Sequence, residues 1–190
     1  MSTFQAYSDF TAQGPNVRAL MSLYALLENE DEKGIRIELT PFVVFLAFSI
    51  ESYLNSLGAR HLPIWDEIER LRWKDKVTIL YKTAGYKPDW GNEPLQFAAE
   101  VFKIRDKLAH GKPERVLGPV IDDANPVEIN PLELQPEWYR KITKDWVLQA
   151  KERFRNLMTH LGNMFGEHES DHLMTATGGV IVDGSIGLLD

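Results

Sequence analysis

The chain has 190 residues, of which 44% are hydrophobic and 11% aromatic, enough to bury one substantial core, so a single domain is expected. It contains no cysteine, which excludes disulfides, zinc–thiolate sites and cysteine nucleophiles. The net charge of −7 argues against broad electrostatic capture of nucleic acid, although a small basic site remains compatible with it.

The chain shows no targeting or membrane segment. The first residues, MSTFQAYSDF, lack the basic stretch and apolar run of a secretory signal. The longest apolar run, Phe42 to Phe48, is far shorter than the ~20 residues that a membrane-spanning helix needs. We therefore expect a cytoplasmic protein that makes no contact with a membrane.

The first part of the chain predicts two helices after an irregular arm. Residues 1–15 show no period and are expected to be irregular. Asn16 is a candidate N-cap for a helix that runs to about Asp31. Thr40-Pro41 predicts the start of a second helix, which ends at about Gly58.

The helix that begins at Thr40 has two packing faces. Its broad apolar face lies roughly opposite a second one, which has Glu51 at its border and consists of Phe45, Phe48, Ser49, Ser52 and Asn55. A helix with two such faces is central in its bundle or contributes to a subunit interface.

The middle and end of the chain predict further helices. Two short ones span about 64–71 and 74–84, the second closed by Gly85, and another ends near His110 because Gly111 and Pro113 follow. Residues 112–136 are rich in proline and predict a long loop. An apolar stripe from Trp138 to Phe165 predicts a last helix of about eight turns. The fold expected for residues 1–166 is an all-α bundle of about five to six helices.

The tail, residues 167–190, differs from the rest. Asp183-Gly184 lies between short apolar runs and is a hairpin signal, so the tail is expected either to form a small ribbon against the bundle or to be a mobile tail. His168 and His172 lie among Glu167, Glu169 and Asp171, and we interpret this stretch as a solvated linker rather than a metal site. No metal or other cofactor is expected.

Arg105 lies in the middle of the apolar stripe of the helix that ends near His110. At ~100° per residue this stripe comprises Leu95, Ala98, Val101, Phe102, Leu108 and Ala109. A buried guanidinium stays charged, so it needs a carboxylate, a phosphate or a subunit interface as its partner. In the structural alternative Arg105 pairs with Glu51, and His110 only interacts with the helix dipole.

Arg105 and His110 are five residues apart, so on a continuing helix they point ~140° away from each other. We expect the helix to end between them, which would let the histidine ring turn toward a groove in front of Arg105. A two-fold axis could then bring two such pairs together.

Two segments, VFLAFSIESYLNSL and EVFKIRDKLAHGKPE, resemble the HEPN superfamily, small all-helical domains of prokaryotic toxin–antitoxin, abortive-infection and other RNA-targeting systems. The resemblance covers roughly residues 17 to 165. Arg105, Asp106 and His110 match the family's Arg-polar-x-x-x-His motif, and Glu51 and Asn55 lie where many members have an acidic or amide residue. The resemblance implies a metal-independent endoribonuclease whose two motifs face each other across a dimer cleft. An antitoxin or a nucleotidyltransferase is the partner to look for in such systems.

The chemistry agrees with that resemblance. Imidazole, with a pKa of ~6.5, can take or give a proton near neutral pH, and a guanidinium can neutralise the charge that builds up on phosphorus. Asp106 would orient His110 or Arg105 through a hydrogen bond; the alternative is that it is only a solvated helix residue. RNA would be bound by the surrounding cations Lys103, Lys107, Lys112 and Arg115. The alternative is a non-catalytic dimeric interaction module of the same fold, in which Arg105 completes an interface ion pair.

Overall fold

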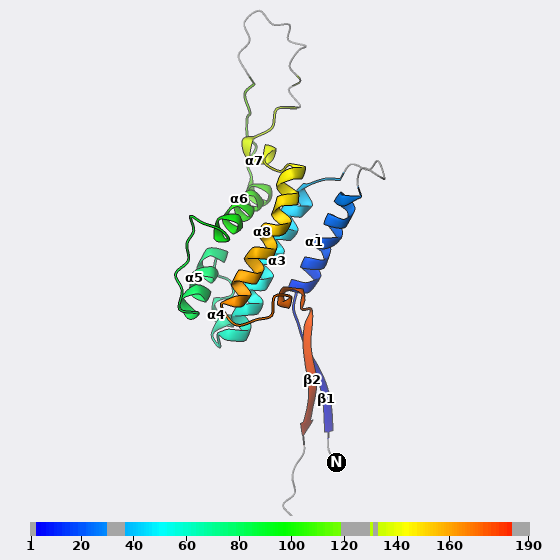
Figure 1. Cartoon of the computed structure of the whole chain (residues 1–190), viewed down its shortest axis with the longest axis vertical. Helices are drawn as coiled ribbons and strands as arrows, with labels where there is room; N and C mark the ends of the chain where they lie inside the picture. Colours follow the sequence, from blue (N-terminus) through cyan, green and yellow to red (C-terminus); the bar gives the residue numbers. More distant parts are fainter. Residues whose placement is uncertain (1–2, 30–36, 119–129, 131–132, 184–190) are drawn as a thin grey trace, which may run out of the picture.

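The computed structural model describes residues 3–29, 37–118, 130 and 133–183. Over these residues the protein is a helical bundle with a two-stranded ribbon at one end (Figure 1). The elements in chain order are β1 Thr3–Phe10, α1 Gln13–Glu28, α3 Thr40–His61, α4 Trp65–Ile68, α5 Trp73–Thr83, α6 Leu95–His110, α7 Glu137–Arg140, α8 Lys144–Asn163, the 3-10 helix η3 Asp171–Leu173, and β2 Ala176–Asp183. The expectation of a mainly helical bundle is confirmed.

α3 is the central helix, since it packs against α1, α5, α6 and α8. Of the described helices it alone is long and apolar enough to cross a membrane, and 56% of the tested stretch is buried within the bundle. The core helix of a soluble protein has the same properties, so this finding is no evidence for a membrane protein. The second face expected for α3 is only partly covered: Ser49 is buried, whereas Phe48 is 48% exposed.

Asn16 does not cap α1, because the helix already begins at Gln13. The Asn16 side-chain amide instead donates hydrogen bonds to the Phe48 carbonyl at 3.4 Å and to Ser52 Oγ at 3.3 Å, both on α3. The residue therefore joins two helices, which a local capping rule does not consider. α3 begins at Thr40 as predicted and continues three residues beyond Gly58 to His61.

The long last helix is two helices. α7 ends at Arg140, and a second helix, α8, begins after Thr143. Thr143 has an extended backbone and caps α8, because its side-chain oxygen accepts a hydrogen bond from the Trp146 N–H at 3.1 Å. Trp146 packs against the core as predicted. Trp138 does not belong to that stripe, and its indole N–H donates to Glu114 at 3.1 Å.

The expectation of an irregular N-terminal arm is wrong. β1 pairs antiparallel with β2, from Phe10 opposite Ala176 at the base to Thr3 opposite Asp183 at the far end. The strand expected from the C-terminal hairpin signal therefore forms, but its partner is the other end of the chain. The other half of the predicted hairpin, from Gly184 on, lies outside the described residues.

The segment between α8 and β2 is not a solvated linker. Asp171 is 6% exposed and pairs with Arg60 of α3, while its carbonyl accepts a hydrogen bond from Gln13 Nε2 at 2.6 Å. Glu167 contacts Arg60 Nε at 3.2 Å and His61 Nε2 at 2.7 Å. These ion pairs attach the tail to the end of α3 and fix the base of the ribbon.

Candidate functional site around Arg105 and His110

α6 is continuous through both motif residues. It ends at Gly111, whose N–H donates to the Lys107 carbonyl at 2.9 Å. A Cβ on Gly111 would lie 2.3 Å from that same oxygen, so this position requires glycine. Gly111 thus ends the helix as predicted, but the helix does not end between Arg105 and His110.

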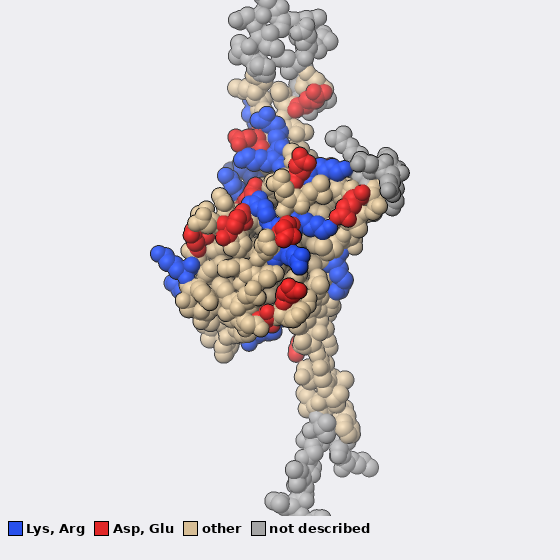
Figure 2. All heavy atoms as spheres, in the orientation of Figure 1, with Lys and Arg blue, Asp and Glu red and all other residues tan. Residues whose placement is uncertain are grey.

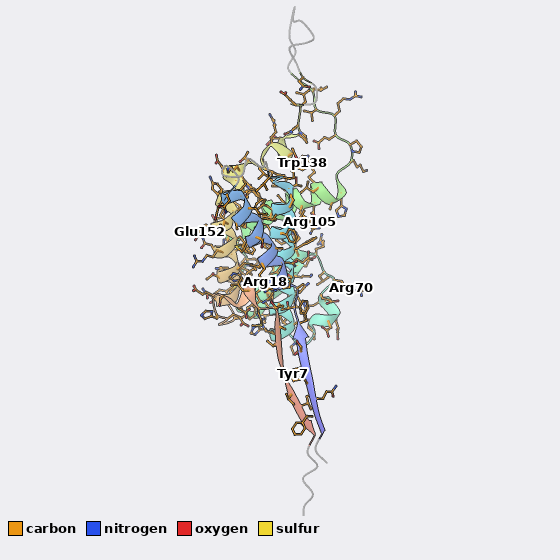
Figure 3. All side chains as sticks on the ribbon, turned by 90° about the vertical axis from the view of Figure 1, so that its right-hand side faces the viewer. Tyr7, Arg18, Arg70, Arg105, Trp138 and Glu152 are labelled. Carbon is orange, nitrogen blue, oxygen red and sulfur yellow. The ribbon has the colours of Figure 1, made fainter. Side chains whose placement is uncertain are left out.

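Arg105 projects from α6 toward α3, in the half of the helical body farther from the ribbon (Figure 3). Its Nη1 lies 3.2 Å from Asp106 Oδ1 and its Nη2 lies 3.8 Å from Glu51 Oε2. The guanidinium carbon is 5.2 Å from the centre of the Phe102 ring. Its Nε is buried and has no hydrogen-bond partner among the described residues. With 24% of the side chain exposed, this guanidinium keeps unused donors within reach of solvent.

Glu51 is shared between two cations. Its Oε1 lies 3.3 Å from Lys76 Nζ, and the Lys76 side chain is only 2% exposed. A buried ammonium needs a counter-charge more than a partly exposed guanidinium does, so Glu51 serves mainly Lys76. Arg105 is consequently not sealed in a bidentate pair with Glu51. Asn55, one turn further along α3, has a buried Oδ1 without a hydrogen-bond partner.

His110 is exposed and lies on the other side of α6. It lines an open depression of about 580 Å³ that does not include Arg105. The other residues that line it are Lys103, Asp106, Lys107, Gly111, Lys112, Pro113 and Glu114. Lys107 Nζ is 3.7 Å from Glu114 Oε2, so one of these cations is already paired.

Within one chain the predicted site residues therefore fall into two groups. Arg105 lies with Glu51 on the α3 side, whereas His110 lies with three lysines on the outer side of α6. Asp106 belongs to both groups, because it contacts Arg105 and also lines the depression. Arg115 is exposed beyond the helix end and does not line the depression.

A second depression, of about 640 Å³, adjoins the first and shares Lys103 and Glu114 with it. Trp138 and Lys141 line it, together with Arg153, which pairs with Glu93 and Glu100. We did not expect Trp138 or Lys141 at this surface. They come from the α7 region, which only the tertiary path of the chain brings beside α6.

The described part of the chain holds no group of three or more histidine or acidic side chains placed to bind a metal ion. His61 bonds Glu167, and the His168 ring contacts only the neighbouring Ser170. His172 is partly buried against Tyr53 and Phe154. A comparison of the chain with protein-family models, curated proteins and solved structures found no match.

Proposed function

We propose that the protein is a metal-independent endoribonuclease of the HEPN type that works as a cytoplasmic homodimer, in a toxin or phage-defence setting. The observation that supports this most is the state of Arg105. A partly exposed guanidinium at the motif position, with one long and one short carboxylate contact on its two Nη atoms, is suited to receive a phosphate.

In this proposal the internal 2′-oxygen of RNA attacks the adjacent phosphorus, and the bond to the 5′-oxygen breaks to leave a 2′,3′-cyclic phosphate. His110 takes the 2′-hydroxyl proton or protonates the leaving 5′-oxygen. Arg105 neutralises the extra negative charge in the transition state. Asp106, which contacts Arg105 and lies beside His110, is a positioning residue.

The substrate strand would lie along the outer face of α6. Lys103, Lys107 and Lys112 line the depression that holds His110, and their charges suit an RNA backbone. Arg115 would add a contact beyond the helix end. An antitoxin or nucleotidyltransferase partner, where one exists, would inhibit by covering this face.

This function needs a second subunit, because Arg105 and His110 lie on different sides of α6. Arg105 and His110 of one chain do not share a depression, so a phosphate has to be held by Arg105 of one subunit and His110 of the other. The half-exposed Phe48 on α3, one turn from Glu51, offers apolar surface for such a contact.

The separation of Arg105 and His110 on different sides of α6 also supports a second candidate, a non-catalytic dimeric interaction module. Asp106 and Glu51 already offset the charge of Arg105, as an interface ion pair would. In that case the arginine fixes the geometry of the dimer and no RNA is cleaved.

The test is cleavage of single-stranded RNA in the presence of EDTA. We expect 2′,3′-cyclic phosphate ends, and a rate lowered by roughly 10²-fold or more in His110→Ala and in Arg105→Ala. His168→Ala is the matched control, since this exposed histidine bonds only its neighbour Ser170. Circular dichroism and molar mass must show that each variant keeps its fold and assembly. Activity that survives both motif substitutions, or that requires magnesium, contradicts the proposal and leaves the interaction module.

A further inference from the structure

The ribbon formed by the two ends of the chain has one apolar face. Residues opposite each other in an antiparallel pair project to the same side, and the register places Ala6 opposite Val180 and Ser8 opposite Gly178. The apolar ribbon face comprises Phe4, Ala6, Ser8 and Phe10 of β1 and Ala176, Gly178 and Val180 of β2. The other face carries Gln5, Tyr7, Asp9, Thr177 and Ile181, and the Tyr7 ring lies against Gly179.

Nothing among the described residues covers the apolar ribbon face. Phe4 and Phe10 are each 70% exposed and Val180 is 59% exposed. The ribbon projects from the end of the bundle (Figure 1), where Thr11 N–H donates to the Thr175 carbonyl at 2.7 Å at its base. Soluble proteins seldom expose so continuous an apolar surface unless it binds something.

A two-stranded ribbon also needs such a contact for its own stability. An isolated pair of strands in water is marginally stable at best, and packing of its apolar face is what normally stabilises it. The attachment at the base holds only one end of this ribbon. The eight-residue strands extend about 27 Å at ~3.4 Å per residue, so most of the ribbon lies beyond the support of the helices.

We propose that the apolar ribbon face packs against the same face of a second copy of this chain. The lack of charge on this face favours a second copy as the partner, because the only charged side chain described on the ribbon is Asp9, on the opposite face. Figure 2 shows charged side chains over the helical body and almost none along the ribbon. A nucleic acid or a charged peptide therefore finds no ionic partner there, whereas an identical uncharged face does not repel itself.

The face is also complementary to itself in shape. When the two ribbons stack in opposite directions about a two-fold axis, Phe4 lies over the partner's Phe10, and Val180 lies over the partner's Gly178. Each stack thus has an aromatic pair at both ends and a bulky side chain over a small one between them. This arrangement puts the two helical bodies at opposite ends of the paired ribbons, so they do not collide.

The area fits a weak dimer. Two phenylalanines that are 70% exposed present roughly 250 Å² between them, and with Val180 and the small residues each copy buries about 400–500 Å². The total of about 800–1,000 Å² is at the low end for specific interfaces. We expect a dissociation constant in the micromolar range, around 10⁻⁵ M.

Val180 and Ile181 provide a matched test. They are neighbours on β2, they are 59% and 55% exposed, and they lie on opposite faces. Val180→Asp and Ile181→Asp add the same charge to the same strand, but only the first places two carboxylates inside the proposed interface. By sedimentation velocity from 1 to 200 µM, Val180→Asp should weaken self-association about tenfold or more, while Ile181→Asp should change it less than twofold.

A dimer through the helices would also change the mass, so a second measurement is needed. Hydrogen exchange of the β1 amides should slow with protein concentration in the unmodified chain and in Ile181→Asp, but not in Val180→Asp. RNA cleavage, where present, should be the same in both variants, which separates this inference from the proposed function. The inference is overturned if the β1 amides show no concentration dependence, or if both variants have equal effects.

Discussion

Lys76 and Glu51 form an ion pair whose two ends lie in different environments. The Lys76 side chain is 2% exposed, whereas that of Glu51 is 36% exposed and also faces Arg105. Glu51→Gln leaves the buried ammonium without its counter-charge. Breaking a fully buried pair in this way costs about 3–5 kcal/mol. Because water reaches Glu51, we expect a smaller loss of about 2 kcal/mol in the free energy of unfolding.

Lys76→Met should behave differently. Methionine fills a similar volume without a charge, so the desolvation cost of the ammonium disappears together with its attraction to Glu51. Such replacements are often neutral or stabilising, and we expect a change within about 1 kcal/mol. The double variant should resemble Lys76→Met, because the carboxylate no longer has a buried charge to balance. The two substitutions should therefore be strongly non-additive.

Urea unfolding followed by tryptophan fluorescence and by circular dichroism measures these differences. A loss of about 2 kcal/mol corresponds to a fall in Tm of about 4–8 °C for a chain of this size. If Lys76→Met is as destabilising as Glu51→Gln, the ammonium itself contributes net stability, which contradicts the expected desolvation cost. Additive effects in the double variant would refute it as well.

Two further predictions concern the core and the pH dependence of stability. Gly58→Ala should destabilise the protein by about 1–3 kcal/mol in the same urea assay, because a Cβ there would lie 2.1 Å from the Trp65 ring; an unchanged midpoint would mean that this contact is loose. Burial lowers the pKa of His160 and of His172 below the ordinary value of 6.5, so the unfolded chain binds more protons just below that pH. The free energy of unfolding should therefore fall as the pH drops through 6.5 and toward the lowered folded-state values. A double variant with glutamine at both positions should have a flatter dependence between pH 7.5 and 5, and an unaltered slope would assign the effect to other groups.

The helices of this protein could largely be predicted from local signals, whereas the sheet could not. Thr40-Pro41 marks the start of α3 because a proline at the first helical turn needs no partner for its missing N–H. Gly85 closes α5 with a φ of +81°. β1 gives no comparable signal, since its partner lies more than 160 residues away and the pairing becomes visible only in three dimensions. The break between α7 and α8 at Thr143 could not be predicted, because the apolar spacing continues across it.

The candidate site could be predicted in part. The sequence indicated that Arg105 needs a partner and that Glu51 was available, and both residues meet across α3 and α6. It did not indicate Lys76, because a lysine on a short amphipathic helix is normally solvated. The competition of Lys76 for Glu51 is what leaves Arg105 with spare donors, so the most informative residue of the site was the one that no motif contains.

The continuous helix through His110 limits what one chain can do by itself. Five residues at ~100° each rotate His110 by ~140° from Arg105, and because Gly111 rather than an earlier residue caps α6, no bend in the described backbone corrects this. A single phosphate cannot contact the Arg105 face and the His110 face of the same helix directly. Metal-independent cleavage at this site therefore requires that the rate rise with the fraction of chains whose helical bodies are paired, with Arg105 of one subunit facing His110 of the other. A specific activity independent of concentration in a protein that is monomeric throughout the assay would exclude the shared site, whatever the effect of substitutions at Arg105 or His110.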